Sequence, residues 1–337
     1  DFPPSFENEE LGMRRHMLLG LAFARIGNFA DSETHIGTAE EQCSRVHCEL
    51  DGEIARARGA IEVRRANLPA ADTAFRKSLQ IARQRGDSFL EATDLLNLGA
   101  VSLRNSRYDD AIDWSNAAAK KFHELGSELD ESKIAGNIGW TYFKLGDYNQ
   151  AFAMTANAQS QAHKLGAVLD EIAWLNSLGM ICFQTGKSTL AENYYQRALE
   201  LAEKTENNDL RFQVLTELAF VSVQLGRQDA AQQFKDKAYE LAHNENDRSA
   251  EMFIHLIEGQ LAASKKNYGQ AEQLFTDVAR AKESISSLRW QAQNELARLH
   301  ETENQIPLAD KEYREALNTV TCARSALAHE EFRLPFQ

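Results

Sequence analysis

Two small residues, twelve positions apart, recur along the whole chain at a spacing of about 40 residues. The pairs are Gly20 and Ser32, Gly59 and Ala71, Gly99 and Ala111, Gly139 and Ala151, Gly179 and Ala191, Ala219 and Ala231, Gly259 and Ala271, and Ala297 and Ala309. Successive second members are 39, 40, 40, 40, 40, 40 and 38 residues apart. Because small residues make up roughly a quarter of an average chain, sixteen in register indicate eight copies of one unit.

The spacing within each pair predicts a helical hairpin. A glycine inside a helix costs about 1 kcal/mol relative to alanine, so its recurrence requires an offsetting gain. Two antiparallel helices joined by a short turn can approach closely only where one of them lacks a bulky side chain. Gly139 facing the helix of Ala151 meets this requirement, and a leucine at either place would push the two helices apart.

Turn residues separate the two helices of each unit. Gly146 and its neighbours supply the left-handed stop of a first helix, as glycine or asparagine does in most of the eight units. Pro69 and Pro307 fall where a second helix would begin, which is a permitted place for proline. We therefore expect an all-α array over residues 9–325, preceded by a leader over 1–8 and followed by a tail over 326–337 that leads towards another domain.

Composition narrows the classes of function. The 337 residues carry a formal net charge of −13, which argues against a nucleic-acid partner. No apolar run approaches the roughly 18 residues of a membrane helix, so no membrane partner is expected. The chain contains no GxxxxGK, HExxH or GxSxG motif and no paired-carboxylate constellation. We expect neither catalysis nor a cofactor from this sequence.

The cysteines and histidines give no metal framework. Cys43, Cys48, Cys182 and Cys322 form no CxxC motif. Cys43 and Cys48 are five residues apart on one expected helix, which is poor geometry for a bridge, so with His47 they are interpreted as ordinary helix-face residues. His123, His163 and His243 share one register, but units about 10 Å apart keep them from sharing a metal.

The small-residue series, the Leu-Gly turns and the aromatic residue after the turn resemble the tetratricopeptide repeat family. The family's unit has 34 residues and this one has 40, which is similar to the longer repeats of kinesin light chains and bacterial peptide-sensing regulators. The resemblance implies a right-handed superhelical α-solenoid whose first helices line a concave, partner-binding surface. Its ligand would be a protein or an extended peptide.

That resemblance places candidate ligand contacts one, four and five residues after the small position, with asparagines on a neighbouring line. These candidates are Asn97, Arg104, Asn137, Trp140, Phe143, Lys144, Asn176, Met180, Phe183, Gln184, Phe220 and Gln224. The alternative is structural, with Phe143 and Phe183 packed between adjacent first helices and Arg104 and Lys144 merely solvated. The basic residues of the second repeat, from Arg56 to Arg85, favour a solvated face of paired charges.

The C-terminal string EEFRLPF, residues 330–336, is similar to the junction in bacterial proteins that join tetratricopeptide repeats to a caspase-like CHAT peptidase domain. This likeness implies that the array serves as the interaction region of such a protein. Two functional hypotheses remain open: a static binding scaffold, and a peptide sensor whose superhelical pitch changes when a ligand binds.

Overall fold

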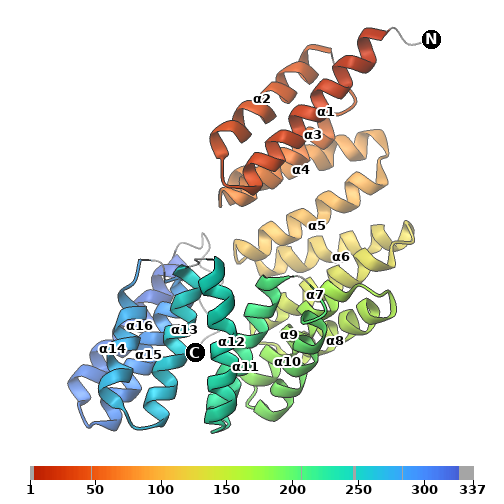
Figure 1. Cartoon of the computed structure of the whole chain (residues 1–337). Coiled ribbons are helices and arrows are strands. Elements are labelled where there is room, and N and C mark those ends of the chain that lie inside the picture. The colour runs from red at the N-terminus through yellow and green to blue at the C-terminus, as the bar shows by residue number, and fades with distance from the viewer. Residues whose placement is uncertain (1–3, 47, 206, 246–247, 283, 326–337) are drawn as a thin grey trace. The chain divides into compact units, whose positions relative to one another are not determined.

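The computed structural model describes residues 4–46, 48–205, 207–245, 248–282 and 284–325. Every regular element in these ranges is an α-helix, and successive helices pair as antiparallel hairpins (Figure 1). The expected all-α solenoid of helical hairpins is confirmed.

The chain divides into two compact units, Asp1–Gln161 and Ala162–Gln337. The first contains α1 (Pro4–Arg25), α2 (Phe29–Val46), α3 (Asp51–Arg64), α4 (Leu68–Arg85), α5 (Ser88–Arg104), α6 (Tyr108–Glu124), α7 (Glu128–Leu145) and most of α8 (Tyr148–Lys164). The second contains α9 (Val168–Gln184), α10 (Ser188–Ala202), α11 (Asn208–Gln224), α12 (Gln228–Glu245), α13 (Arg248–Ser264), α14 (Tyr268–Arg280), α15 (Ser286–Thr302) and α16 (Ile306–Ser325). The predicted tail over 326–337 lies outside the described residues.

The small residues that define the repeat are buried where the two helices of each hairpin meet. A methyl group added at Gly179 would lie 2.5 Å from the Tyr195 ring, and one added at Gly59 would lie 2.6 Å from the Phe75 ring. The predicted close approach is therefore confirmed. The structure adds that each glycine makes room for the side chain sixteen residues later, in the pairs Gly20–Ile36, Gly59–Phe75, Gly99–Ser115, Gly139–Thr155, Gly179–Tyr195 and Gly259–Phe275.

Apolar clusters join neighbouring hairpins within each unit. In the first unit, Phe75 and Leu79 of α4 pack with Leu95 and Val101 of α5, and the same cluster continues to Ile134 of α7. Adjacent first helices also touch, as α1 touches α3, α3 touches α5, and α5 touches α7. A first helix inside a unit, such as α5, is thus covered by its own second helix, by the preceding second helix and by neighbouring first helices.

Residues in the left-handed backbone conformation end the first helices, as the turn sequences predict. Gly146 and Gly186 have φ of 80° and 75°. In the second hairpin, however, Ala66 rather than Asn67 takes the left-handed conformation, with φ of 60°. Asn67 instead caps α4, where its side chain accepts a hydrogen bond from the backbone N–H of Ala70.

The expectation for Cys43 and Cys48 is wrong, because the two residues form a disulfide. Helix α2 ends at Val46, so Cys48 does not lie on the same helix as Cys43. The chain turns back after the helix, and the backbone N–H of Cys48 donates to the carbonyl of Cys43 at 3.2 Å. This reversal brings the Cα atoms to 4.9 Å, within the range that a disulfide requires. His47 lies outside the described residues.

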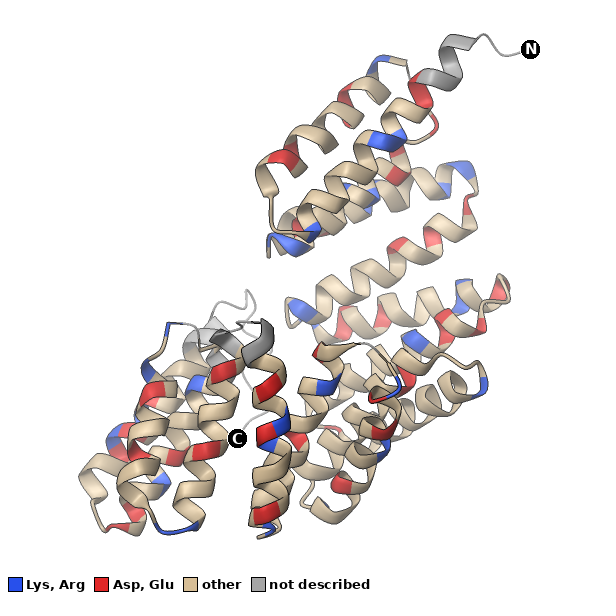
Figure 2. Cartoon of the chain, viewed as in Figure 1, with Lys and Arg blue, Asp and Glu red and all other residues tan. Residues whose placement is uncertain are grey.

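Charged residues of both signs are distributed along the helices (Figure 2). Most of the basic patch in the second repeat is paired, but largely across helices rather than within one. Arg58 contacts Glu33 and Glu40 of α2, each at 2.6 Å, and Arg85 contacts Asp51 at 2.7 Å. Among the described helices, none combines the length and the apolar character needed to span a membrane.

Two of the three histidines in register contact a glutamate eight residues later. His123 lies 3.3 Å from Glu131, and His163 lies 3.0 Å from Glu171. The side chain of His243 is outside the described set. Within the described residues, no group of three or more histidine, cysteine, aspartate or glutamate side chains is placed to hold a metal.

Candidate peptide-binding surface

The fifth residue after each small position is exposed near the end of the first helices. In the first unit, all four residues at this register are cationic: Arg25, Arg64, Arg104 and Lys144. We call these four residues the cationic row. None of them forms an ion pair with a carboxylate of a described residue, in contrast to Arg58 or Arg85. The sequence interpretation included Arg104 and Lys144 but missed Arg25 and Arg64, which the same counting from Gly20 and Gly59 would have found.

The last member of the cationic row lies on aromatic rings. Trp140 and Phe143 stack with ring centroids 4.9 Å apart, and Phe143 lies 5.8 Å from Tyr148. These three residues form the aromatic cluster, and each is half-buried. The Lys144 ammonium lies 4.7 Å from the Trp140 centroid and 5.9 Å from that of Phe143. The structure thus brings three predicted contacts together and adds Tyr148.

The aromatic rings change the properties of Lys144. Its side chain as a whole counts as exposed, but the rings take water away from the ammonium, which lowers the pKa of Lys144. The remaining stabilisation of the charge comes from the ring faces, since cation–π contacts contribute about 0.5–2 kcal/mol. Lys144 therefore occupies an aromatic face that an incoming side chain could take instead.

The other predicted contacts of the first unit lie near this surface but are not joined to it by hydrogen bonds. Asn97 on α5 and Asn137 on α7 are half-buried on first helices that touch each other. Arg104 donates a 3.4 Å hydrogen bond to the carbonyl of Val63. That contact leaves most of the guanidinium's donors available.

The second unit has different chemistry at the same register. Gln184, Gln224, Ser264 and Thr302 are exposed and neutral, and Gln224 accepts a hydrogen bond from the Ser188 hydroxyl. Met180 and Phe183 are half-buried. Of the predicted residues of this unit, Gln184 and Gln224 therefore lie on a polar, uncharged surface.

Two predicted residues of the second unit point elsewhere. Phe220 packs against Ile257 and Leu261 of α13, so its ring serves the core between first helices. Asn176 is buried, and its Oδ1 has no hydrogen-bond partner among the described groups. It lies three residues before Gly179, whereas Asn97 and Asn137 lie two before their glycines, and this turn of about 100° directs it inward.

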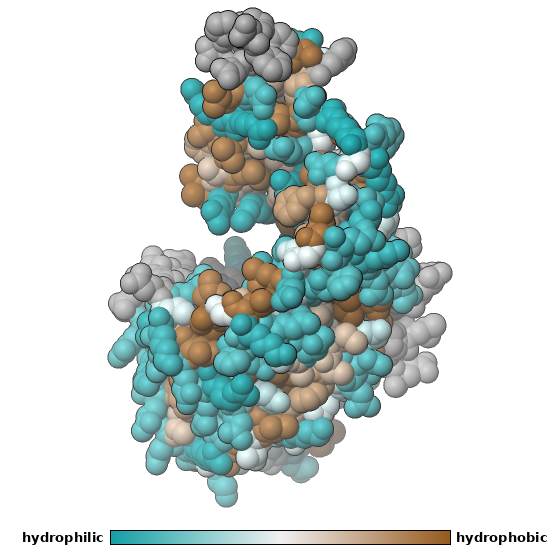
Figure 3. All heavy atoms as spheres, turned by 90° about the vertical axis from the view of Figure 1, so that its right-hand side faces the viewer, coloured by the Kyte–Doolittle hydropathy of each residue, from teal (hydrophilic) through white to brown (hydrophobic). Residues whose placement is uncertain are grey.

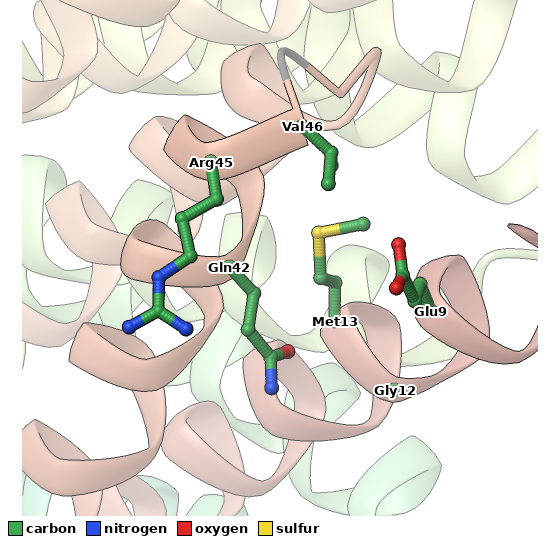
Figure 4. A pocket seen from close by; sticks show the side chains of 6 residues that line it. All are labelled: Glu9, Gly12, Met13, Gln42, Arg45 and Val46. Atoms are coloured by element: carbon green, nitrogen blue, oxygen red, sulfur yellow. The ribbon is translucent and has the colours of Figure 1, made fainter.

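A cavity of about 330 Å³ lies on the first hairpin, between α1 and α2 (Figure 4). Its lining residues are Glu9, Gly12, Met13, Gln42, Arg45 and Val46. Sequence interpretation did not predict it. Among the described residues, six from two helices line it, and they include charges of both signs in Glu9 and Arg45.

Comparisons with known proteins agree with the repeat architecture. Residues 170–244 and 132–154 match two models of the tetratricopeptide repeat. No curated protein matches the sequence.

Solved structures with tetratricopeptide-like folds are similar to the chain. A Rap protein complexed with competence and sporulation factor shares 15% identity, with a TM-score of 0.71 over 88% of this chain and 81% of that one. The apo form of the quorum sensor NprR from B. thuringiensis shares 16%, with a TM-score of 0.66 over 89% and 86%. The Rap conjugation gene regulator of plasmid pLS20 in complex with the Phr* peptide shares 13%, with a TM-score of 0.65 over 91% and 88%.

Proposed function

We propose that the chain is a peptide- or protein-binding scaffold, and that its first unit holds an extended acidic segment with an aromatic or apolar anchor. The observation that carries the proposal is the cationic row, four exposed and unpaired cations that lead to the half-buried aromatic cluster. Four unpaired cations in register are unexpected in a chain with a net charge of −13. Aromatic anchors and arginine are frequent centres of binding energy.

The register suggests the spacing of the ligand. First helices that pack together are about 8–10 Å apart, and an extended peptide rises about 3.3 Å per residue. One acidic side chain at about every third position would therefore meet successive members of the cationic row. The apolar anchor would follow the acidic residues and displace Lys144 from Trp140.

The similar structures support peptide binding in general, because two of them were solved with a bound factor or peptide. At 15% and 13% sequence identity, these structures show a similar fold but do not indicate which ligand this chain binds. The acidic character of the ligand comes from the residues of this chain alone.

The test is a peptide array of extended twelve-residue sequences in which the number of Asp and Glu residues and the position of one Trp or Leu are varied. The best peptide is then titrated against the whole chain by fluorescence anisotropy. Trp140→Ala should weaken binding about thirtyfold, the usual effect of losing an interface anchor. The double variant Arg64→Glu with Arg104→Glu should abolish the preference for acidic peptides.

Lys77→Glu is the matched control, because Lys77 is an exposed, unpaired cation on the second helix α4. This variant should bind the peptide as the wild type does. Binding should also weaken with added salt, since exposed charges are screened. Equal affinity for acidic and basic peptides would contradict the proposal.

A second candidate is a peptide sensor whose superhelical pitch changes on binding. It is favoured by the similarity to the quorum sensor NprR. Small-angle scattering with and without the selected peptide distinguishes the two: the sensor compacts, and the static scaffold does not. The string EEFRLPF supports a place in a CHAT-type peptidase, and a His/Cys pair in the gene after Gln337 would test that part.

A further inference from the structure

The carboxyl group of Glu217 on α11 has one hydrogen bond and no ion pair among the described residues. The hydroxyl of Tyr195 on α10 donates to its Oε2 at 3.4 Å, and its Oε1 has no partner in that set. Tyr195 is fully buried, whereas Glu217 is half-buried, so a ligand can reach the carboxyl group. Burial raises the pKa of Glu217 to about 7, and the hydrogen bond from Tyr195 opposes this shift only in part.

Glu217 lies on the line where ligand contacts are expected. It comes two residues before the small residue Ala219, as Asn97 and Asn137 come two residues before their glycines. It also comes seven residues before Gln224, and seven residues make about two helical turns. Glu217 therefore shares one face of α11 with Gln224, whose side chain is exposed.

A second glutamate at this register, Glu295 on α15, has the partners that Glu217 lacks. The Gln260 amide of α13 donates to Oε1 of Glu295 at 3.0 Å, and the Arg298 guanidinium lies 3.8 Å from the same oxygen. Both glutamates come two residues before the small residue of their repeat. The two repeats thus show the same side chain with and without donors from the protein.

The residues in the place of those two donors are apolar beside Glu217. Phe220 stands three residues after it, in the register of Arg298. Met180 of α9 stands in the register of Gln260, and neither apolar side chain can donate a hydrogen bond to a carboxylate. Apolar atoms interrupt the hydrophilic surface at several places (Figure 3), so apolar neighbours alone do not mark a site. An accessible carboxyl group without donors does, because its ionised form is stabilised only by a cation from outside.

We propose that Glu217 binds the side chain of an arginine in a peptide that lies on the second unit. The guanidinium donates to the carboxylate, as Gln260 and Arg298 do to Glu295, and the methylene stem of the arginine lies on Met180. The proposal rests on the peptide-binding function given above but not on the cationic row, which lies in the first unit and takes carboxylates.

The test uses short neutral peptides with one arginine at varied positions, each paired with a copy in which citrulline replaces the arginine. Citrulline keeps the shape of the side chain without its charge. The peptides are selected on the whole chain at about pH 8, where Glu217 is ionised, and are measured by fluorescence anisotropy. The arginine peptide should bind about tenfold more tightly than its citrulline copy, the usual contribution of a charge-assisted hydrogen bond.

These peptides contain no acidic residue, so their binding does not depend on the cationic row. A failure of the acidic-peptide proposal and a failure of this one are therefore separate results.

Glu217→Gln should remove the difference between the arginine peptide and its citrulline copy. The affinity for the citrulline copy should not change, which shows that the variant is folded. Met180→Gln should also reduce the difference, because the added amide would bind the carboxylate as Gln260 binds Glu295. Glu295→Gln is the matched control and should keep the full difference, since Glu295 already has its donors.

Three outcomes would contradict the proposal. The first is equal affinity of the wild type for the arginine peptide and its citrulline copy. The second is a difference that Glu217→Gln does not reduce, which would assign the charge effect to another carboxylate. The third is free argininamide that binds at Glu217 as tightly as the peptide does, which would make the site a receptor for a small cation.

Discussion

Asp94 on α5 is a fully buried carboxyl group in the first unit. Neither of its oxygens has a hydrogen-bond partner among the described groups, and the nearby Ser78 hydroxyl donates to the carbonyl of Gly52 instead. Burial raises the pKa of Asp94 to about 7, and the charge of Asp87 adds to this. The Ser78 hydroxyl and the Arg56 charge oppose the shift only in part. Four other repeats place isoleucine or valine at this register, namely Ile54, Ile134, Val214 and Ile254, so Asp94 differs from them in placing a carboxyl group inside an apolar interface.

Asp94 should make the protein less stable as the pH rises. The folded state keeps the proton up to about pH 7, whereas the unfolded chain releases it near pH 4. The contribution of Asp94 therefore lowers the free energy of unfolding between about pH 4 and pH 7, and this contribution does not change further above pH 7. Asp94→Asn should stabilise the protein by about 4 kcal/mol more at pH 8 than at pH 4. Urea denaturation at both pH values measures this, and an equal effect at both would contradict it.

Gly179 should not tolerate alanine. The added methyl group would meet the fully buried Tyr195 ring at 2.5 Å, and overpacking costs about 1–3 kcal/mol. Gly269 is the control, because it lies in α14 with nothing within 4 Å of an added methyl group. Gly269→Ala should stabilise by up to about 1 kcal/mol through helix propensity. Thermal denaturation should move the two Tm values in opposite directions.

At the scale of the helix, most of the fold could be predicted from the sequence, because each hairpin is specified by nearby residues. The pairs of small residues and the turn glycines were sufficient to predict the hairpins. The features that could not be predicted depend on the position of a helix end to a precision of one or two residues. Asp87 caps α5, and α2 stops at Val46, which lets Cys48 reach Cys43. A pattern of side chains does not fix such an end, because several neighbouring residues can cap or break a helix.

The candidate surface was predicted less well, since exposure depends on neighbouring repeats. Trp140, Phe143 and Lys144 do lie together, but Phe220 and Asn176 face the interior. One position of register, or about 100° around a helix, separates an exposed residue from a buried one. The sequence alone did not show which of the two applied to Asn176.

The Cys43–Cys48 disulfide should stabilise the junction between α2 and α3. Closing a loop of this size stabilises the folded state by about 2 kcal/mol in the chain-entropy model. A reducing agent should therefore lower the Tm of the wild type. The double variant Cys43→Ser with Cys48→Ser should start at the lower Tm and show no response to the reducing agent. A response in that variant would assign the effect to another cysteine.

At the scale of the whole molecule, the described hairpins within each unit contact only their neighbours along the chain, so stability is expected to be a sum of local contributions. The two compact units, Asp1–Gln161 and Ala162–Gln337, each have their own core. The cationic row and the aromatic cluster lie in the first unit. The residues at the same register of the second unit are neutral and polar. Binding and stability can therefore be altered separately in the two units.

Local destabilisation should stay local. Gly179→Ala in the second unit should speed amide hydrogen exchange in α9, α10 and α11, because these helices share the affected hairpin and its neighbour. Exchange in α1–α4 should not change. Hydrogen-exchange mass spectrometry resolves these segments, and faster exchange throughout the chain would show that the array unfolds as a single cooperative body.

The glycines and the side chains that fill their place have a consequence for how such a chain can change over generations. Both halves of each contact lie sixteen residues apart within one hairpin, so duplication of one 40-residue segment copies the whole contact. A glycine accepts Ile, Phe, Ser, Thr or Tyr opposite it, as Gly20, Gly59, Gly99, Gly139 and Gly179 show. The contact between each glycine and the side chain opposite it can thus change without a matching change of the glycine in another hairpin. Recombination at the junctions between hairpins, rather than within them, leaves each of these glycine contacts intact.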